Sequence, residues 1–402
     1  MTFFILLISL LIIGLLSNFS GKLAELIKLP SLIGMMLLGM LIGPYCFKLV
    51  PNITISVAPF IKDFALITVL FIAGLGISKS QMHKIGRPAI LLSIVPATIE
   101  GFIIAYLSTI FLGFHFIQGA ILGFIIAAVS PAVLIPSMLD LIDKRLGEDK
   151  SIPEMLLVGA SADDTVAITL FTTFLSLYMQ KSSGGDFSLI KSIATIPLTI
   201  ILSIIISYIL CKLSTFVISK FKTKYLKVIF VFSICIILRI IESRFKIEVF
   251  NSLLTIMLYG FFLRSQIEDS ALYIKTKMDK FWKLGKLYLF VFVGMAINPS
   301  LALGYLKIGV IILTISLSFR SLGVLLSLVN TNLTMKERLF CVVAYLPKAT
   351  VQSAKAGIPL QMGVAGGEIM QAIALLSVLI TAPIGAIGIK IFAPKCLNKI
   401  ND

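Results

Sequence analysis

Two adjacent acids, Asp163 and Asp164, lie in the middle of an apolar run from Ile152 to Met179. If this run is a helix, the acids lie roughly 16–18 Å from its start, because each residue advances a helix by about 1.5 Å. That depth is close to the middle of a bilayer core about 30 Å thick. Each carboxylate there opposes insertion by on the order of 2.5–3.5 kcal/mol, so we expect the pair to serve a function.

A lysine and a second set of opposite charges lie in other apolar runs. Lys348 is near the centre of the run 338–357, and its ammonium would be as costly unpaired as a carboxylate, so we expect it to pair with one of the two aspartates. Neighbouring helical positions point about 100° apart, so the other aspartate is then free for a cation or a proton. Glu100 and Arg320 are expected to form a buried, structural salt bridge.

Hydroxyl groups near the acids are candidate ligands for a small hard cation such as Na⁺ or Li⁺. Ser130 and Thr165 are the residues we consider, although hydroxyls also pack at the interfaces between membrane helices. The only metal ion expected at Asp163 and Asp164 is the transported one. No cofactor is expected.

The composition is that of an integral membrane protein. The mean hydropathy is +1.06, and 58% of the residues are hydrophobic. Only 13% are charged, against about a quarter in a soluble domain. The first apolar run, 2–19, has neither the basic N-terminal region nor the small-residue cleavage site of a signal peptide, so we expect it to be a retained spanning helix. The net charge of +16 does not indicate nucleic-acid binding, because there is no separate basic domain to carry it.

Apolar runs separated by polar or Gly- and Pro-rich segments predict thirteen transmembrane spans in an all-α, polytopic membrane protein. They run roughly over residues 2–20, 29–46, 59–77, 88–112, 115–139, 152–179, 189–211, 225–241, 247–263, 284–298, 303–329, 338–357 and 367–393. When alternate loops are assigned to one side of the bilayer, that side receives most of the 35 Lys and Arg residues. The other side receives a minority, which includes Lys62, Arg239 and Lys355. Basic loops face the cytoplasm, so we expect the N-terminus outside and the C-terminus inside, in a bacterial plasma membrane.

The thirteen spans form a single membrane domain, 1–402, that divides into two inverted halves. Residues 1–179 would form the first six-helix repeat, 189–211 a linker span, and 225–393 a second repeat of opposite orientation, as in many secondary transporters. Gly74 and Gly294 match at the same offset as Glu100 and Arg320.

Prolines interrupt two spans that this symmetry pairs. Pro131 and Pro136 lie in the fifth span and Pro347 lies in the twelfth, and each removes a backbone donor. Broken backbone at membrane depth is tolerated only where it is buried in protein or lines a water-filled cavity. We therefore predict two broken helices at the functional site. A simple proline kink is the alternative.

Three segments resemble the signature stretches of a known transporter group. Ala160–Ile168, Val129–Leu139 and Tyr345–Ala354 are similar to those of the sodium/proton antiporters of the cation:proton antiporter 2 superfamily, and within it to the NHA-type sodium/hydrogen exchangers. The resemblance implies a homodimer of thirteen-helix subunits in which spans 5 and 12 cross as unwound helices. It also implies a translocation core, from spans 3–6 and 10–13, that moves against a dimerisation scaffold.

By the same resemblance, Asp164 is the principal carrier of the cation and the proton, and Asp163 is the partner of Lys348 when no ion is bound. The implied activity is that of a transporter and not of an enzyme. A K⁺/H⁺ exchanger and a sodium-coupled organic-anion symporter are the alternatives. An intramembrane aspartyl protease is disfavoured, because its two acids must face one another. The number of protons exchanged per cation is left open.

Overall fold

The computed structural model describes residues 2–27, 29–77, 79–183, 189–221, 223–245 and 250–399. Within these ranges the chain is all-α, with one short 3-10 turn at Glu148–Lys150 and no named strand. The helices are α1 (Thr2–Leu26), α2 (Ser31–Ile42), α3 (Asn52–Gly76), α4 (Lys79–Phe111), α5 (Phe116–Ile126), α6 (Pro131–Asp143), α7 (Ile152–Ser183), α8 (Leu189–Lys220), α9 (Lys224–Phe245), α10 (Ser252–Gln266), α11 (Glu268–Met295), α12 (Pro299–Gly304), α13 (Leu306–Ser327), α14 (Met335–Ala344), α15 (Thr350–Lys355), α16 (Ile358–Gln361) and α17 (Gly367–Cys396).

The expected all-α, polytopic fold is confirmed. In the described part of the chain, eight segments are long and apolar enough to cross a membrane. They are 2–26, 52–76, 85–111, 116–143, 152–179, 197–220, 306–327 and 367–396. The other five expected spans correspond to α2, α9, α10, α11 and the pair α14 and α15, which are short, broken or more highly charged. The count of thirteen spans therefore stays a prediction.

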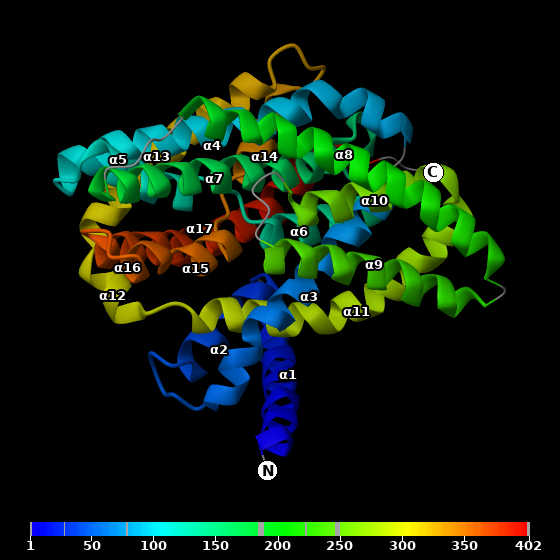
Figure 1. Cartoon of the computed structure of the whole chain (residues 1–402), viewed down its shortest axis with the longest axis horizontal. Helices are drawn as coiled ribbons and strands as arrows, with labels where there is room; N and C mark the ends of the chain where they lie inside the picture. Colours follow the sequence, from blue (N-terminus) through cyan, green and yellow to red (C-terminus); the bar gives the residue numbers. More distant parts are fainter. Residues whose placement is uncertain are drawn as a thin grey trace.

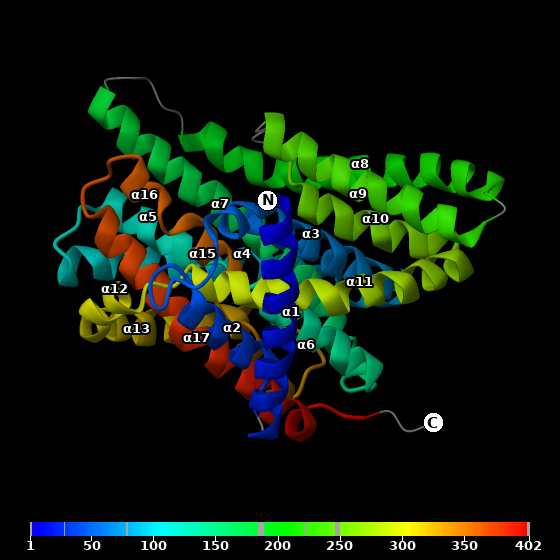
Figure 2. The ribbon, with the colours of Figure 1, turned by 90° about the horizontal axis from the view of Figure 1, so that it is seen from below.

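The helices pack in two groups. In the first, α4 packs against α5, α7 and α13, and α17 packs against α14. In the second, α3 packs against α10 and α11, and α2 packs against α1 and α11. Figure 1 shows α4, α5, α7 and α13 above α1, α2, α3 and α11, and Figure 2 shows α8, α9 and α10 side by side along one edge. We call α4–α7 with α12–α17 the core group, and α1–α3 with α8–α11 the scaffold group.

Two glycines allow α3 and α11 to cross other helices of the scaffold group closely; α3 and α11 correspond to spans 3 and 10 of the expected core, and that expected division stays a prediction. A Cβ on Gly74 of α3 would lie only 1.9 Å from the carbonyl oxygen of Met257 in α10. A Cβ on Gly294 of α11 would lie 2.0 Å from the carbonyl oxygen of Met36 in α2. Small residues let membrane helices approach this closely. The two glycines matched in the sequence thus hold α3 on α10 and α11 on α2.

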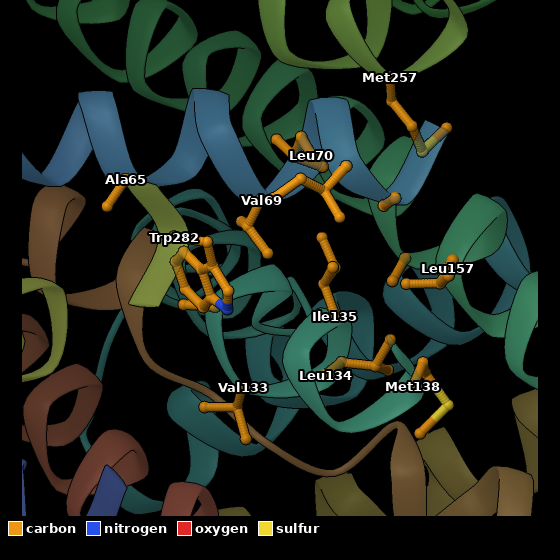
Figure 3. Close-up of a cluster of buried hydrophobic side chains, with 14 of the residues drawn as sticks. Ala65, Val69, Leu70, Val133, Leu134, Ile135, Met138, Leu157, Met257 and Trp282 are labelled. Carbon is orange, nitrogen blue, oxygen red and sulfur yellow. The ribbon is translucent and has the colours of Figure 1, made fainter. Parts of the chain in front are cut away.

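An apolar cluster fills the space between the two groups along α6. Val133 and Ile135 of α6 are fully buried, and Figure 3 shows them with Val69 and Leu70 of α3 and Trp282 of α11. Protein interiors packed in this way leave few voids as large as a water molecule. The cluster therefore forms a dry layer between the core group and the scaffold group.

Candidate functional site

Two interrupted helices meet next to the acid pair. One break, 127–130, separates α5 from α6, and the other, 345–349, separates α14 from α15. The backbone N–H of Ser130 donates to the carbonyl oxygen of Pro347 over 2.8 Å. The breaks of two segments distant in the sequence are therefore joined directly.

The three prolines singled out in the sequence occupy different places. Pro347 lies within the second break, and Pro131 is the first residue of α6, where its missing N–H needs no partner. Pro136 was expected in the interruption, but it lies inside α6. The break ends earlier than predicted because a membrane helix can continue through a proline when its surroundings satisfy the freed backbone groups.

Side chains satisfy backbone groups that the breaks leave without helical partners. The Gln352 amide donates to the carbonyl oxygens of Ile126, at 3.1 Å, and Ala128, at 2.8 Å. The Arg320 Nε donates to the carbonyl oxygen of Tyr345 at 2.8 Å. An unsatisfied backbone group at this depth costs several kcal/mol, so these bonds explain how the breaks are tolerated.

Three buried charges form a cluster beside the breaks. Glu100 Oε2 accepts from Arg320 Nη1 at 2.7 Å and from Lys348 Nζ at 2.6 Å, and all three side chains are fully buried. The structure thus contains the expected contact between Glu100 and Arg320. The expected pairing of Lys348 with an aspartate is wrong for this structure, because the ammonium and the guanidinium converge on the same carboxylate oxygen.

The two aspartates of α7 lie in separate environments. Asp163 Oδ2 accepts from the backbone N–H of Val129 at 2.7 Å and lies 3.5 Å from Arg320 Nη2. Asp164 accepts no hydrogen bond and forms no ion pair with any residue in the described ranges, and its Oδ1 is buried. Asp163 is thus tied to the charge cluster, whereas Asp164 is not.

Asp164 lines a cavity of about 320 Å³ between the core group and the scaffold group. Ser161 and Pro131 contribute to its wall from the core group, and Leu70 and Asn251 contribute from the scaffold group. Of the two acids, Asp164, which has no bonding partner among the described residues, therefore faces the space through which a small ion could arrive.

A second cavity, of about 530 Å³, lies at the other end of α6. Ser137 and Asp140 of α6 and Lys286 of α11 line it, and neither acid of the pair is among the described residues around it. Residues 133–135 lie between the two cavities along α6, in the apolar cluster of Figure 3. The acid pair is therefore next to one cavity and separated from the other by a dry layer.

The two candidate hydroxyl ligands are both buried, and Thr165 directly follows Asp164 on α7. Ser130 Oγ, in the first break, has no hydrogen-bond partner among the described residues. Thr165 Oγ1 accepts from the side-chain amide of Asn251 at 2.8 Å. Sequence reasoning missed Asn251, because a single asparagine before an apolar run signals a helix cap and no more.

Sequence reasoning also misplaced a group of charges near this cavity. Lys62, Arg239 and Lys355 were counted with the basic residues of one side of the bilayer although each falls inside an expected span, and in the structure they lie within α3, α9 and α15. Arg239 Nη2 lies 2.9 Å from Asp63 Oδ1, and Arg239 Nη1 donates to Glu242 Oε2. Asp63, next to Lys62, and Glu242, one turn after Arg239, are the sequence signals that could have indicated paired charges inside these spans.

Comparisons with known proteins give the family and the fold of the chain. Residues 6–395 match the family model described as "Sodium/hydrogen exchanger, transmembrane". Sodium/hydrogen exchanger 9B2 of Homo sapiens is 30% identical, over 94% of this chain and 73% of that protein. Sodium/hydrogen exchanger 9B1 of Macaca fascicularis is 27% identical, over 98% of this chain and 80% of that protein. The sodium proton antiporter MjNhaP1 of Methanocaldococcus jannaschii shares the fold, with a TM-score of 0.78, 20% identity, and coverage of 98% of this chain and 99% of that one.

Proposed function

The chain belongs to the sodium/hydrogen exchanger family, whose members are transporters and not enzymes, and on that premise we propose that it exchanges Na⁺ or Li⁺ for protons at Asp163 and Asp164. In this proposal Asp164 carries the cation or the proton, and the two compete for its carboxylate. Asp163 is part of the balanced charge cluster beside it.

The count of buried charges is the observation that supports this proposal. Arg320 and Lys348 supply two positive charges, and Glu100 and Asp163 supply two negative charges. Asp164 then carries one negative charge in excess, and it lines the cavity. A bare charge at this depth is costly, so Asp164 is stable only with a bound cation or a proton.

This requirement couples the two ion fluxes. A site that is neutral only when it holds a cation or a proton can cross the apolar interior when loaded, but not when empty. We propose alternating access, in which the core group moves against the scaffold group and opens Asp164 to the cavity at one end of α6 and then to the other. The two cavities and the dry layer between them support this proposal, and the inverted repeats and the homodimer remain part of it.

The orientation of the chain is a further part of the proposal. The loops rich in lysine and arginine support an N-terminus outside and a C-terminus inside. The chain is an integral, multi-pass membrane protein. The relatives named above are animal and archaeal proteins, so the bacterial origin stays a prediction without support from them.

The test is Asp164→Asn in proteoliposomes, with Asp269→Asn as the matched control. Asp269 makes the same change at an exposed position in the first turn of α11, and it lines neither cavity. We expect sodium-driven proton flux to disappear in Asp164→Asn and to persist in Asp269→Asn. Flux at the wild-type rate in Asp164→Asn would refute the assignment.

Two other transport functions are distinguished by their substrates. Potassium-driven proton flux above the sodium-driven flux would favour a K⁺/H⁺ exchanger. Sodium-dependent uptake of a labelled organic anion without proton movement would favour a symporter. The excess negative charge of Asp164 argues against an anionic substrate in this cavity, because like charges repel in a poorly solvated site.

A further inference from the structure

A chain of polar contacts in the scaffold group leads to the cavity. Both Asp63 oxygens accept from Arg239, with distances of 2.9 and 3.1 Å. Arg239 also donates to Glu242 Oε2, which accepts from the Ser252 hydroxyl at 2.6 Å. A bidentate arginine with several charge-assisted bonds is a geometrically rigid connection. The start of α10, where Ser252 lies, is therefore held against α9 and α3.

Asn251, next to Ser252, is fixed at both ends of its side chain. Its Oδ1 accepts from the backbone N–H of Leu254 at 2.9 Å and so caps α10. Its amide nitrogen donates to Thr165 Oγ1 at 2.8 Å. The capping bond sets the orientation of the amide, so the second bond has little freedom to adjust.

The bond between Asn251 and Thr165 crosses from the scaffold group to the core group beside the carrier. Thr165 is the residue that follows Asp164 on α7, and both are almost completely buried. Asn251 and Asp164 line the same cavity. A hydrogen bond at this point sets the distance between α7 and α10, and with it the direction in which the Asp164 carboxylate enters the cavity.

We propose that Asn251 is a positioning residue for the cation site, acting on Asp164 through the hydroxyl of Thr165. The inference rests on the function proposed above. It adds that Asn251 affects the cation affinity only while Asp164 faces the cavity that both residues line. When α7 moves away from α10 toward the other state, the bond between Asn251 and Thr165 must break. Asn251 therefore controls the affinity for sodium from the cavity side of the membrane and not from the opposite side.

The experiment measures the KM for sodium of Asn251→Ala and Thr165→Val in right-side-out and inverted membrane vesicles. One hydrogen bond corresponds to about a 2- to 10-fold change in affinity. We expect the KM to rise by that factor in one vesicle orientation only, with the maximal rate within about twofold of wild type. Thr165→Ser, which keeps the hydroxyl, should restore the wild-type KM.

The control is Thr172→Val, an exposed position on α7 whose hydroxyl donates only to carbonyls of its own helix. It should leave the KM unchanged in both orientations. The double variant Asn251→Ala with Thr165→Val should be no worse than either single variant, because both remove the same bond.

Three results would overturn the inference: an unchanged KM in Asn251→Ala, an equal rise in both orientations, or additive effects in the double variant. These failures are distinct from a failure of the proposed function. If Asp164→Asn abolishes exchange while Asn251→Ala changes nothing, the exchanger assignment stands and only the role of Asn251 is lost. If Asp164→Asn transports normally, the proposed function itself fails.

Discussion

Charge balance in the buried cluster can be tested by removing one charge at a time. Glu100→Gln keeps a carbonyl oxygen as an acceptor but leaves Arg320 and Lys348 opposite Asp163 alone. Lys348→Gln leaves Glu100 and Asp163 opposite Arg320 alone, which is an excess of one negative charge. Breaking a buried ion pair by removing one partner costs about 3–5 kcal/mol, so we expect each single variant to lose that much unfolding free energy.

The double variant Glu100→Gln with Lys348→Gln separates charge balance from simple packing loss. It removes one charge of each sign and leaves Arg320 opposite Asp163. Glu100 and Lys348 contact one another at 2.6 Å, so the effects of their substitutions should not add. We expect the double variant to be more stable than the sum of the single losses by about 2–3 kcal/mol.

The assay is unfolding in detergent micelles, with Lys144→Gln as the control. Lys144 and Asp140 form an ion pair in which both side chains are more than half exposed, so its loss should cost no more than about 1 kcal/mol. If the double variant loses the full sum of the single losses, the cluster is not held by mutual charge balance. The count that leaves Asp164 in excess would then be refuted too.

Two further outcomes follow from geometry already described. Gly74→Ala should destabilise the protein by about 1–3 kcal/mol in the same unfolding assay, because the new Cβ meets the Met257 carbonyl and must force α3 away from α10. Gly76→Ala is the control, since a Cβ there meets only Leu139 Cδ2 at 3.9 Å. Equal losses in both variants would contradict the close crossing of α3 and α10. One excess carboxylate predicts exchange of one cation for one proton, so an imposed membrane voltage should leave the rate of proteoliposome exchange unchanged, and a rate that follows the voltage would show that a second group gives up a proton.

The broad architecture could be read from the sequence because its signals are large and local. Apolar runs long enough to cross a bilayer predict helices without knowledge of their neighbours, and a charge within such a run carries a cost of several kcal/mol wherever it lies. The functional importance of Asp163 and Asp164 follows from this cost, and the breaks around Pro131 and Pro347 follow from the backbone donors that proline removes. The structure places all four residues near one another.

The partner of Lys348 could not be derived in the same way. The cost of a buried ammonium predicts that some acid must compensate it, but it does not say which one. Glu100 comes from α4 and Lys348 from the second break, and they meet because α4 packs against α5 and the break after α5 is bonded to the second break. That arrangement depends on helix crossings, which hydropathy does not encode.

Asn251 and Arg239 were missed for a related reason. Hydropathy placed Arg239 inside the expected span 225–241, but it does not show which acids a charged side chain meets, and the partner Asp63 comes from α3. The contact of Asn251 with Thr165 joins residues far apart in the sequence. Local patterns predict an N-terminal cap at Asn251, and only the packing of α10 on α7 gives it a second role.

The hydrogen bonds across the two breaks make the halves of the chain dependent on one another. Ser130 of the first half binds the Pro347 carbonyl of the second, and Gln352 of the second half binds the Ala128 carbonyl of the first. Each half inserted alone would leave polar backbone unsatisfied within lipid. If the gene were divided between α7 and α8, neither fragment could form its own interruption until it had bound the other, so assembly of the fragments would have to precede their stable folding.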